Sequence, residues 1–465
     1  MILRAAIFAV LGLTSFAATF EVGPGLPLET PGQVPWATLE PGDTILIRWR
    51  AEPYRDKFVI CRQGTADAPI TLRGVPGPEG QRPVLSGENA VEAPGLNYWN
   101  GNRGLIKVGG ASIPPDTMPR FIVIENLELR SARPPYQFVD RAGNRQTYSA
   151  NAAAIYVEKA QNLTIRNCIL TDSGNGLFSG TAAAPNISRD IIIDSNYIHS
   201  NGNEGSAFEH NVYTEALGIT FQFNQLGPLR AGSSGNNLKD RSAGLIVRYN
   251  WIEGGNRQLD LVETGSPTLQ EDERYRTTFV YGNILVEHNG PGNNQLIHYG
   301  GDSGNLARYR KGTLYLYHNT LISTRLDATT LIRLSSNEEQ AIVRNNLLYL
   351  PPGSGPLALV DAAGILDFSY NWLQPGYRIT RNTLSGTVLD SANLLGDDPG
   401  FANLGERNLR PTAASPVVDA AGPLPDVIYP DREVLAQYYL HQAAELRNTV
   451  NAPDIGAYEF MPPVQ

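Results

Sequence analysis

The sequence predicts an all-β fold, a single-stranded right-handed parallel β-helix of about ten turns with capped ends and a short C-terminal helix. Short β-rich segments recur along the 465 residues, and each carries an asparagine. The 46 glycines and 33 prolines indicate frequent turns and short regular elements. Hydrophobic residues make up 42% and charged residues only 18%, which excludes a disordered chain and a coiled coil.

The first residues are typical of a secretory signal peptide. Arg4 precedes the apolar run 5–13, and small residues follow as far as Ala18. This run is shorter than the ~20 residues that span a bilayer. We therefore expect residues 1–18 to be a signal peptide and residues 19–465 to form one exported β-helix domain. It would be secreted or periplasmic, with no membrane span after signal removal.

Residues 39–85 are expected to cap the N-terminal end and lead into the first turns, because an open solenoid end would expose unpaired strand edges. The repeat that follows has intervals of 25 to 41 residues between its asparagines, which are Asn126, Asn167, Asn196, Asn224, Asn250, Asn283, Asn319, Asn346 and Asn371.

This spacing favours a β-helix over a β-propeller, because most intervals are shorter than the ~40 residues of a four-stranded blade. A strand of four to six residues buries its apolar face only when equivalent strands stack on it. Asparagine suits the corner between strands, since it tolerates left-handed φ and can bond to the matching asparagine one turn away.

Near the other end, segment 430–446 has apolar residues at helical spacing, so we expect a short amphipathic helix that covers the C-terminal turns. Cys61 and Cys168 lie in strand-like apolar runs. Export permits a disulfide between them, and two buried free thiols are an equal alternative.

Two segments near the N-terminus, LEPGDTILIR and GTADAPITLRG, resemble the opening of the chondroitinase-B and alginate-lyase-like branch of the parallel β-helix polysaccharide lyases. The closing segments SPVVDAA (415–421) and PDIGAYEF (453–460) resemble the tails of many secreted bacterial β-helix proteins. The resemblance implies a pectate-lyase-like solenoid and a polysaccharide substrate.

The middle turns carry the polar residues. Aligned on the asparagines, Tyr213 lies over Lys239, Glu215 lies over Arg241, and Asp260 follows Lys239. Successive side chains alternate between faces, so these residues are expected to form two outward ladders with a step of ~4.8 Å. Loops 232–237 and 265–276 would wall a groove beside them.

Eliminative cleavage of a uronate polymer needs a cation or metal at the carboxylate, a base for the C5 proton and an acid for the leaving oxygen. The stretch 238–242 resembles the strand that carries the base lysine in that lyase family, which implies Lys239 as the base. Arg241 beside it is expected to lower the pKa of this lysine. Arg241 and Arg257 are candidates for the neutralising or acid groups, with Tyr213, His210, Glu215 and Asp260 as further catalytic candidates.

The family's paired calcium ligands before the lysine are absent here, where the sequence reads GSSGNN. No cofactor is firmly predicted, although Ca²⁺ could be held by Glu215, Asp240 or Asp260. The candidates for substrate binding are His298, Tyr299, Trp251 and Glu263.

Two alternatives remain open. The same carboxylates could serve a glycoside hydrolase, or the chain could be a non-catalytic β-helix that binds polysaccharide or acts as a structural rod. The net charge of −9 without a basic run argues against nucleic acid as a partner. We expect a monomer.

Overall fold

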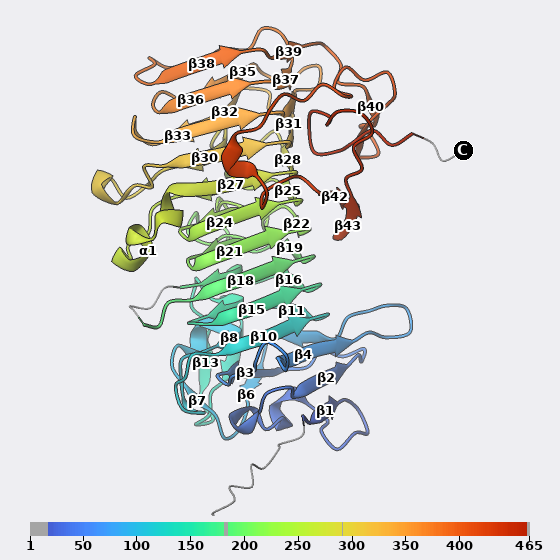
Figure 1. Cartoon of the computed structure of the whole chain (residues 1–465). Coiled ribbons are helices and arrows are strands. Elements are labelled where there is room, and N and C mark those ends of the chain that lie inside the picture. Colours follow the sequence, from blue (N-terminus) through green and yellow to red (C-terminus); the bar gives the residue numbers. More distant parts are fainter. Residues whose placement is uncertain (1–16, 181–184, 291, 463–465) are drawn as a thin grey trace, which may run out of the picture.

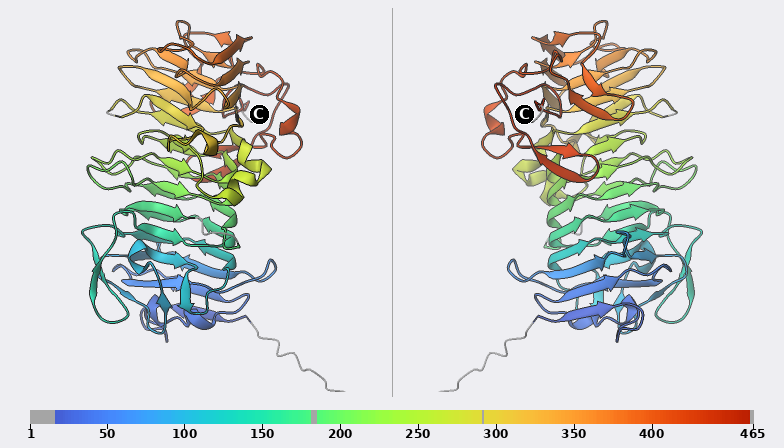
Figure 2. Two further views of the ribbon diagram at one scale, coloured as in Figure 1. Left: turned by 90° about the vertical axis from the view of Figure 1, so that its left-hand side faces the viewer. Right: turned by 90° about the vertical axis from the view of Figure 1, so that its right-hand side faces the viewer.

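The computed structural model describes residues 17–180, 185–290 and 292–462, so all of the predicted signal peptide except Ala17 and Ala18 lies outside the described residues. The described chain winds into a column of stacked turns with three long, mainly parallel sheets (Figure 1). The predicted right-handed parallel β-helix is confirmed. Figure 2 shows the C-terminal segment folded back along one side of the column.

The first sheet consists of β1 (Thr19–Val22), β2 (Thr44–Arg48), β4 (Ile70–Val75), β10 (Arg120–Glu125), β15 (Gln161–Arg166), β18 (Arg189–Asp194), β21 (Leu217–Gln222), β24 (Ala243–Arg248), β27 (Thr277–Tyr281), β30 (Thr313–Tyr317), β33 (Gln340–Arg344), β36 (Ile365–Ser369) and β38 (Thr387–Ser391). The second consists of β5 (Val84–Ser86), β11 (Glu128–Arg130), β16 (Ile169–Thr171), β19 (Tyr197–His199), β22 (Gln225–Leu226), β25 (Trp251–Glu253), β28 (Ile284–Glu287), β31 (Thr320–Ser323), β34 (Leu347–Tyr349), β37 (Trp372–Leu373) and β39 (Leu394–Leu395).

The third sheet runs through β13 (Arg145–Thr147), β12 (Gln137–Val139), β6 (Ala90–Glu92), β3 (Asp56–Ile60), β8 (Gly104–Val108), β14 (Ala153–Val157), β17 (Asn175–Ser179), β20 (Val212–Thr214), β23 (Leu238–Asp240), β26 (Leu259–Leu261), β29 (Gln295–Tyr299), β32 (Thr329–Leu334) and β35 (Leu357–Val360). Three small two-stranded antiparallel sheets are β7 (Asn97–Tyr98) with β9 (Ala111–Ile113), β40 (Phe401–Asn403) with β41 (Asn408–Pro411), and β42 (Ala436–Tyr439) with β43 (Ala443–Leu446). One α-helix in the described chain, α1 (Pro267–Glu271), and several 3₁₀ turns lie in loops.

The core is made of aliphatic rows that run along the axis of the column. Ile122, Leu163, Ile191 and Ile219 are in register on four successive strands, and none is more than 2% exposed. Ile192, one residue on, faces outward and is 41% exposed. The alternation of a β-strand therefore sends one set of side chains into the core and the other to the surface.

A buried asparagine ladder follows the corner between the first and second sheets. Each side-chain amide donates to the carbonyl oxygen of the asparagine one turn away at 2.9–3.1 Å, through Asn196, Asn224, Asn250, Asn283, Asn319, Asn346, Asn371 and Asn393. The same side chain also donates to main-chain carbonyls, as Asn283 does to those of Val247 and Tyr281. The ladder thereby satisfies main-chain groups that have no water to bind.

The predicted alignment was wrong by one residue at the first two asparagines. Asn167 is in register with Ser195, because Arg166 pairs with Asp194, and Cys168 occupies the ladder position beside Asn196. From Asn196 onward, the residue with left-handed φ is the one before the ladder asparagine, such as Ser195 or Tyr249. Of the asparagines in the predicted repeat, Asn126 and Asn167 alone have positive φ, so tolerance of left-handed φ explains asparagine at those two positions and not in the ladder.

Segment 39–85 is not a separate cap. Its strands β2, β3, β4 and β5 already belong to the three long sheets, and β1 extends the first sheet beyond them. Trp36 covers this end by stacking on Phe58 with ring centroids 3.9 Å apart. The long sheets contain 13, 11 and 13 strands in the described chain, and the third count includes the branch β6, β12 and β13, so about ten stacked turns remain, as expected.

The predicted C-terminal helix over 430–446 is wrong, because this segment forms the β42–β43 hairpin. Its fully buried Tyr438 packs on Trp251 of the second sheet, while Leu435 and Leu446 are 64% and 69% exposed. A lone segment of this length is only marginally helical in water, so contacts with the column decide its conformation.

Cys61 and Cys168 are both buried and free, so the free-thiol alternative holds in this structure. Burial raises the pKa of Cys168 to about 12, which keeps the thiol protonated. No helix within the described residues has the length and apolar character needed to cross a membrane.

We predict that Asn283→Ala destabilises the fold by about 3 kcal/mol or more, since each buried partner left unpaired costs about 1–3 kcal/mol. Urea unfolding followed by circular dichroism measures the change. The exposed Asn382, which donates to Asp361, provides the control Asn382→Ala. An equal effect of the two substitutions would contradict a structural role for the ladder.

Candidate functional site

The third sheet carries a row of polar side chains on its outward face. Tyr213, Lys239, Asp260 and His298 are in register on β20, β23, β26 and β29. Val212, Leu238 and their successors in the row beside it point into the core. The predicted ladder of Tyr213, Lys239 and Asp260 is therefore confirmed.

Lys239 lies between two carboxylates. Its Nζ is 2.8 Å from Asp260 Oδ2 and 2.5 Å from Asp302 Oδ2, and the side chain is 10% exposed. Burial by itself would lower the pKa of this lysine, but the charges of Asp260 and Asp302 outweigh it and raise the pKa. This environment differs from the expected one, in which Arg241 lowered the pKa.

Asp260 is the most heavily bonded carboxylate of the cluster. Besides Lys239 it accepts hydrogen bonds from Asn236 Nδ2 and His298 Nδ1, both at 2.8 Å, and Arg257 Nη1 lies 3.6 Å away. Burial would raise the pKa of Asp260, but the bond from His298 and the charge of Lys239 hold it well below its usual range. The group is a permanent anion at neutral pH.

Arg241 joins the ladder to a loop that sequence reasoning missed. Its Nε donates to the Tyr213 hydroxyl oxygen at 2.9 Å, and its Nη2 lies 3.2 Å from Asp302 Oδ1. The main-chain N–H groups of Asp302 and Ser303 both donate to the buried carboxylate of Glu263 at 2.8 Å. Glu263 thus positions the loop rather than lying open to a ligand.

Asp302 lies after β29 in the run GGDSG, and its side chain is one-third exposed. The glycine-rich run at the end of the strand that carries His298 was the only sequence signal for it. Burial would raise the pKa of Asp302, but Lys239 and Arg241 lower it.

The two histidines near the row are neutral at physiological pH. Burial and the nearby Lys239 lower the pKa of His210 to about 3, and its Nδ1 accepts the main-chain N–H of Asn236 at 2.9 Å. Burial also lowers the pKa of His298, although Asp260 opposes this shift. His298 Nε2 lies 2.8 Å from Ser335 Oγ, so both ring nitrogens have partners.

Several predicted residues lie elsewhere. Asp240 and Tyr299 point into the core, where Asp240 pairs with the fully buried Arg310 at 3.3 Å. Trp251 belongs to the second sheet and donates to Glu253. Glu215 is at the edge of the cluster and accepts a hydrogen bond from Thr264.

The residues suggested for calcium do not converge. Asp240 is in register with Thr214 and Leu261 on the inward face, while Asp260 is in register with Lys239 on the outward face. Alternation along β23 and β26 therefore separates their carboxylates. Within the described ranges, no three His, Cys, Asp or Glu side chains gather as metal ligands would.

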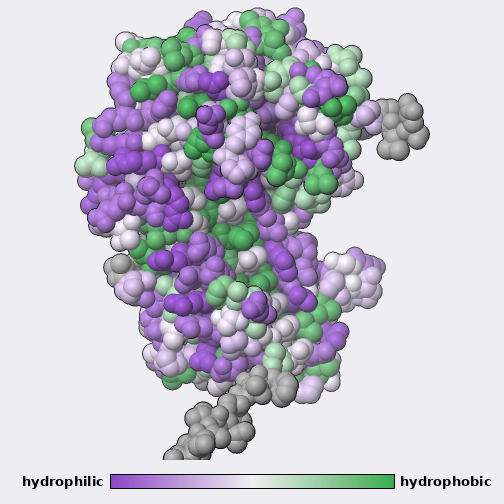
Figure 3. Space-filling view, in the orientation of Figure 1, coloured by the Kyte–Doolittle hydropathy of each residue, from purple (hydrophilic) through white to green (hydrophobic). Residues whose placement is uncertain are grey.

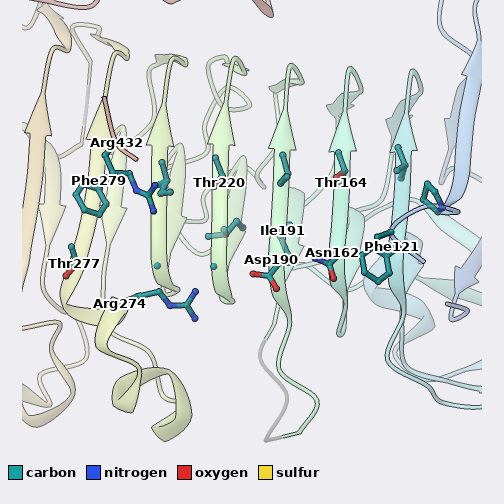
Figure 4. Close-up of a pocket in the computed structure, with 18 of the residues that line it drawn as sticks. Phe121, Asn162, Thr164, Asp190, Ile191, Thr220, Arg274, Thr277, Phe279 and Arg432 are labelled. Atoms are coloured by element: carbon teal, nitrogen blue, oxygen red, sulfur yellow. The ribbon is translucent and has the colours of Figure 1, made fainter. Parts of the chain in front are cut away.

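A wide groove of about 790 Å³ lies on the first sheet (Figure 4). Its floor is the outward row that includes Val123, Thr164, Ile192 and Thr220, and Figure 3 shows hydrophobic side chains exposed in the middle of this face. Insertion 265–276 contributes Glu273 and Arg274 to this groove. The insertion also reaches the strand end beside Glu263, where the Tyr275 hydroxyl accepts the main-chain N–H of Thr264 at 3.0 Å.

We place the candidate site at the charged cluster of the third sheet, defined as Tyr213, Lys239, Arg241, Arg257, Asp260, His298 and Asp302. The groove contains none of these residues. Proton transfer and charge stabilisation require ionisable groups that converge, and the cluster provides them, whereas the floor of the groove is mainly aliphatic.

No protein-family model matches the sequence, and no curated protein matches it. Among solved structures, pectate lyase Pel9A aligns over 95% of this chain and 97% of its own, with a TM-score of 0.51 and 11% identity. The chain has the parallel β-helix fold of that enzyme. The alginate lyase from Paenibacillus sp. str. FPU-7 aligns over 71% of this chain and 94% of its own, with a TM-score of 0.46 and 14% identity.

The GH136 lacto-N-biosidase from Eubacterium ramulus aligns over 81% of this chain and 67% of its own, with a TM-score of 0.37 and 11% identity. At these identities the likeness concerns the fold, and function depends on the residues of the site.

We predict that Lys239→Met destabilises the protein by an amount on the order of 3 kcal/mol at neutral pH, because Asp260 then loses its main cation in a buried position. The loss should shrink as the pH falls. The lowered pKa of Asp260 gives stability that is present above the carboxyl's unfolded pKa, about 3.9, and disappears as Asp260 is protonated.

Urea titrations at several pH values measure this dependence. The control is Lys311→Met, because Lys311 pairs with Glu338, whose side chain is 62% exposed, and such pairs contribute little. A pH-independent loss would contradict the coupling of Lys239 to Asp260.

Proposed function

We propose that the protein is an exported polysaccharide-degrading enzyme that cleaves a uronate-containing polymer by β-elimination at the charged cluster. The support is a single observation. Lys239 Nζ and Arg241 Nη2 hold the two oxygens of one carboxylate, that of Asp302, at 2.5 and 3.2 Å. A cation pair with this geometry suits the carboxylate of a uronate sugar.

Asp302 would leave this position when substrate binds. The Asp302 side chain is one-third exposed and lies on a loop. It can therefore turn away while Glu263 keeps the main chain of the loop in place. The substrate carboxylate then lies between Lys239 and Arg241, and its neutralised charge makes the neighbouring C5–H bond more acidic.

Tyr213 is our candidate for proton transfer. Its oxygen accepts from Arg241 Nε at 2.9 Å, and a cationic donor aimed at this oxygen stabilises the phenolate form that can act as a base. In the elimination the Tyr213 phenolate takes the C5 proton, and the C5–H electron pair forms the C4–C5 double bond. The C4–O bond breaks, and the Tyr213 hydroxyl returns the proton to the leaving oxygen.

Lys239 is assigned to neutralisation in this scheme instead of proton abstraction. A base must first lose its own proton, and the carboxylates of Asp260 and Asp302 raise the pKa of Lys239 and keep the proton on it. Arg257, on the far side of Asp260, adds a third cation to the cluster.

The hydrolase alternative has weaker support. It requires a carboxylic acid that stays protonated to donate to the leaving oxygen. The pKa values of Asp260 and Asp302 are both lowered, and Asp240, whose pKa burial raises, points into the core. The cluster therefore offers two anions and no exposed acid.

We predict that incubation with polygalacturonate, alginate or glycosaminoglycans yields an ultraviolet chromophore from the new double bond conjugated to the carboxylate. Spectrophotometry measures it, and a reducing-end assay runs in parallel. Reducing ends without the chromophore would indicate hydrolysis. Neither signal on the whole panel would contradict the enzymatic proposal and leave a binding or structural role.

We predict that Tyr213→Phe lowers kcat by about 100-fold or more, the usual contribution of a proton-transfer group, with little change in stability. The ring and its edge-on contact with Phe178 are kept. Tyr315→Phe is the matched control, because Tyr315 lies outward on the first sheet and stacks on Phe279. Unchanged turnover in Tyr213→Phe would remove this residue from the mechanism.

A further inference from the structure

The outward row of the third sheet continues beyond the charged cluster toward the N-terminus. Tyr156 and Phe178 precede Tyr213 in the same register on β14 and β17. Their rings stack with centroids 5.3 Å apart, and Phe178 meets Tyr213 edge to face at 5.2 Å. An aromatic strip thus leads directly to Lys239.

Arg103 lies across the start of this strip. Its guanidinium carbon is 4.6 Å from the ring centre of Tyr156 and 4.7 Å from that of Phe178. Its Nε is buried and has no hydrogen-bond partner in the described chain. No ion pair of Arg103 occurs there either, and the residues outside the described ranges include no Asp or Glu.

A second group of cations lies at the opposite end of the row. Arg333 follows His298 in register on β32, and Arg257 is close to it. Arg257 is 9% exposed, and its Nε has no partner among the residues described. Burial lowers the pKa of Arg257, Asp260 opposes this, and Arg333 lowers it further.

These arginines lack a full set of acceptors. Asp260 is the one carboxylate that pairs with Arg257 in the described residues, and it is already bonded to Lys239 and His298. Arg257 Nη2 donates to Gln295 Oε1 at 3.0 Å, but the buried Nε groups of Arg103 and Arg257 have no acceptor among the described residues. Buried N–H groups without acceptors are costly, so an anionic ligand would stabilise this arrangement. The concentration of cations is notable in a chain with a net charge of −9.

We propose that Arg103 and Arg333 are anion subsites for one polyanionic sugar chain that lies along the third sheet, parallel to the axis of the column. The inference rests on the proposed function for the identity of this ligand. Lys239 and Arg241 bind the acidic group at the point of cleavage. Arg103, beside its aromatic rings, and Arg333, beside Arg257, bind acidic groups farther along on either side.

The register sets the spacing of the subsites. Tyr156 and Phe178 are three and two strands before Lys239, and Arg333 is three strands after it. With a step of ~4.8 Å between strands, both subsites lie roughly 10 to 14 Å from Lys239. A disaccharide at Lys239 is too short to reach either of them, whereas a long oligomer reaches both.

The test is binding of oligogalacturonates and alginate oligomers of graded length to the full chain, measured by isothermal titration calorimetry. We expect Arg103→Gln and Arg333→Gln each to weaken binding of long oligomers roughly 10-fold or more, the size of one lost charge-assisted hydrogen bond. Binding of disaccharides should not change. Arg103→Lys should recover part of the affinity, because it keeps the charge but loses the planar contact with the rings.

Three controls accompany these variants. Circular dichroism checks the fold of each variant. Arg130→Gln, on the second sheet where Arg130 pairs with Glu128, should bind like the parent protein. Methyl-esterified oligomers, which lack the negative charges, should bind weakly to all forms and show no dependence on Arg103 or Arg333.

The outcomes separate this inference from the proposed function. If long oligomers bind in a way that depends on Arg103 and Arg333 but are not cleaved, the subsite proposal is supported and the proposed elimination is contradicted. Turnover that depends on Tyr213 together with unchanged affinities in folded Arg103→Gln and Arg333→Gln would retain the elimination and overturn the subsites. Absence of binding to any anionic oligomer by the parent protein would overturn the subsites directly.

Discussion

The register of the stacked turns is the constraint on which the rest of this structure depends. The asparagine ladder, buried from Asn196 to Asn371 and ending at the half-buried Asn393, bonds each turn to the next through side chain and main chain. One turn therefore cannot slip along another without leaving polar groups unpaired in the core. Because the register is fixed, each outward row carries one side chain per strand. A ligand aligned with the axis therefore meets functional groups at a constant step of ~4.8 Å.

This regularity accounts for the electrostatics of the third sheet. Neighbouring outward positions are too close for like charges to remain uncompensated, and the row places the anion Asp260 beside the cation Lys239, followed by the neutral His298. The loop that carries Asp302 provides a further anion. At the two ends Arg103 and Arg333 form no ion pair within the described chain, and these are the positions at which we propose that an external anion binds.

The outward faces of the first and third sheets differ in chemistry although the same repeating backbone forms both. The first sheet presents a floor of Val123, Ile192 and Thr220 to its groove, with Asp190 and Arg274 at the side, and the third presents charged and aromatic side chains along one row. The loops decide the difference, since insertion 265–276 folds over the first sheet while the GGDSG loop turns toward Lys239. A likeness in fold to a pectate lyase would not have distinguished these faces.

The sequence alone determined the solenoid, the corner asparagines from Asn196 onward and the shared ladder of Tyr213, Lys239 and Asp260, because these follow from local alternation and from a repeat that is visible along the chain. It did not determine the hairpin at 436–446, the one-residue offset at Asn126 and Asn167, or the presence of Asp302 between Lys239 and Arg241. Those features depend on contacts between distant segments and on loops without periodicity. The protonation of Lys239 was decided in the same way, since the pKa of a buried group is set by the charges that the tertiary structure brings within a few ångströms of it.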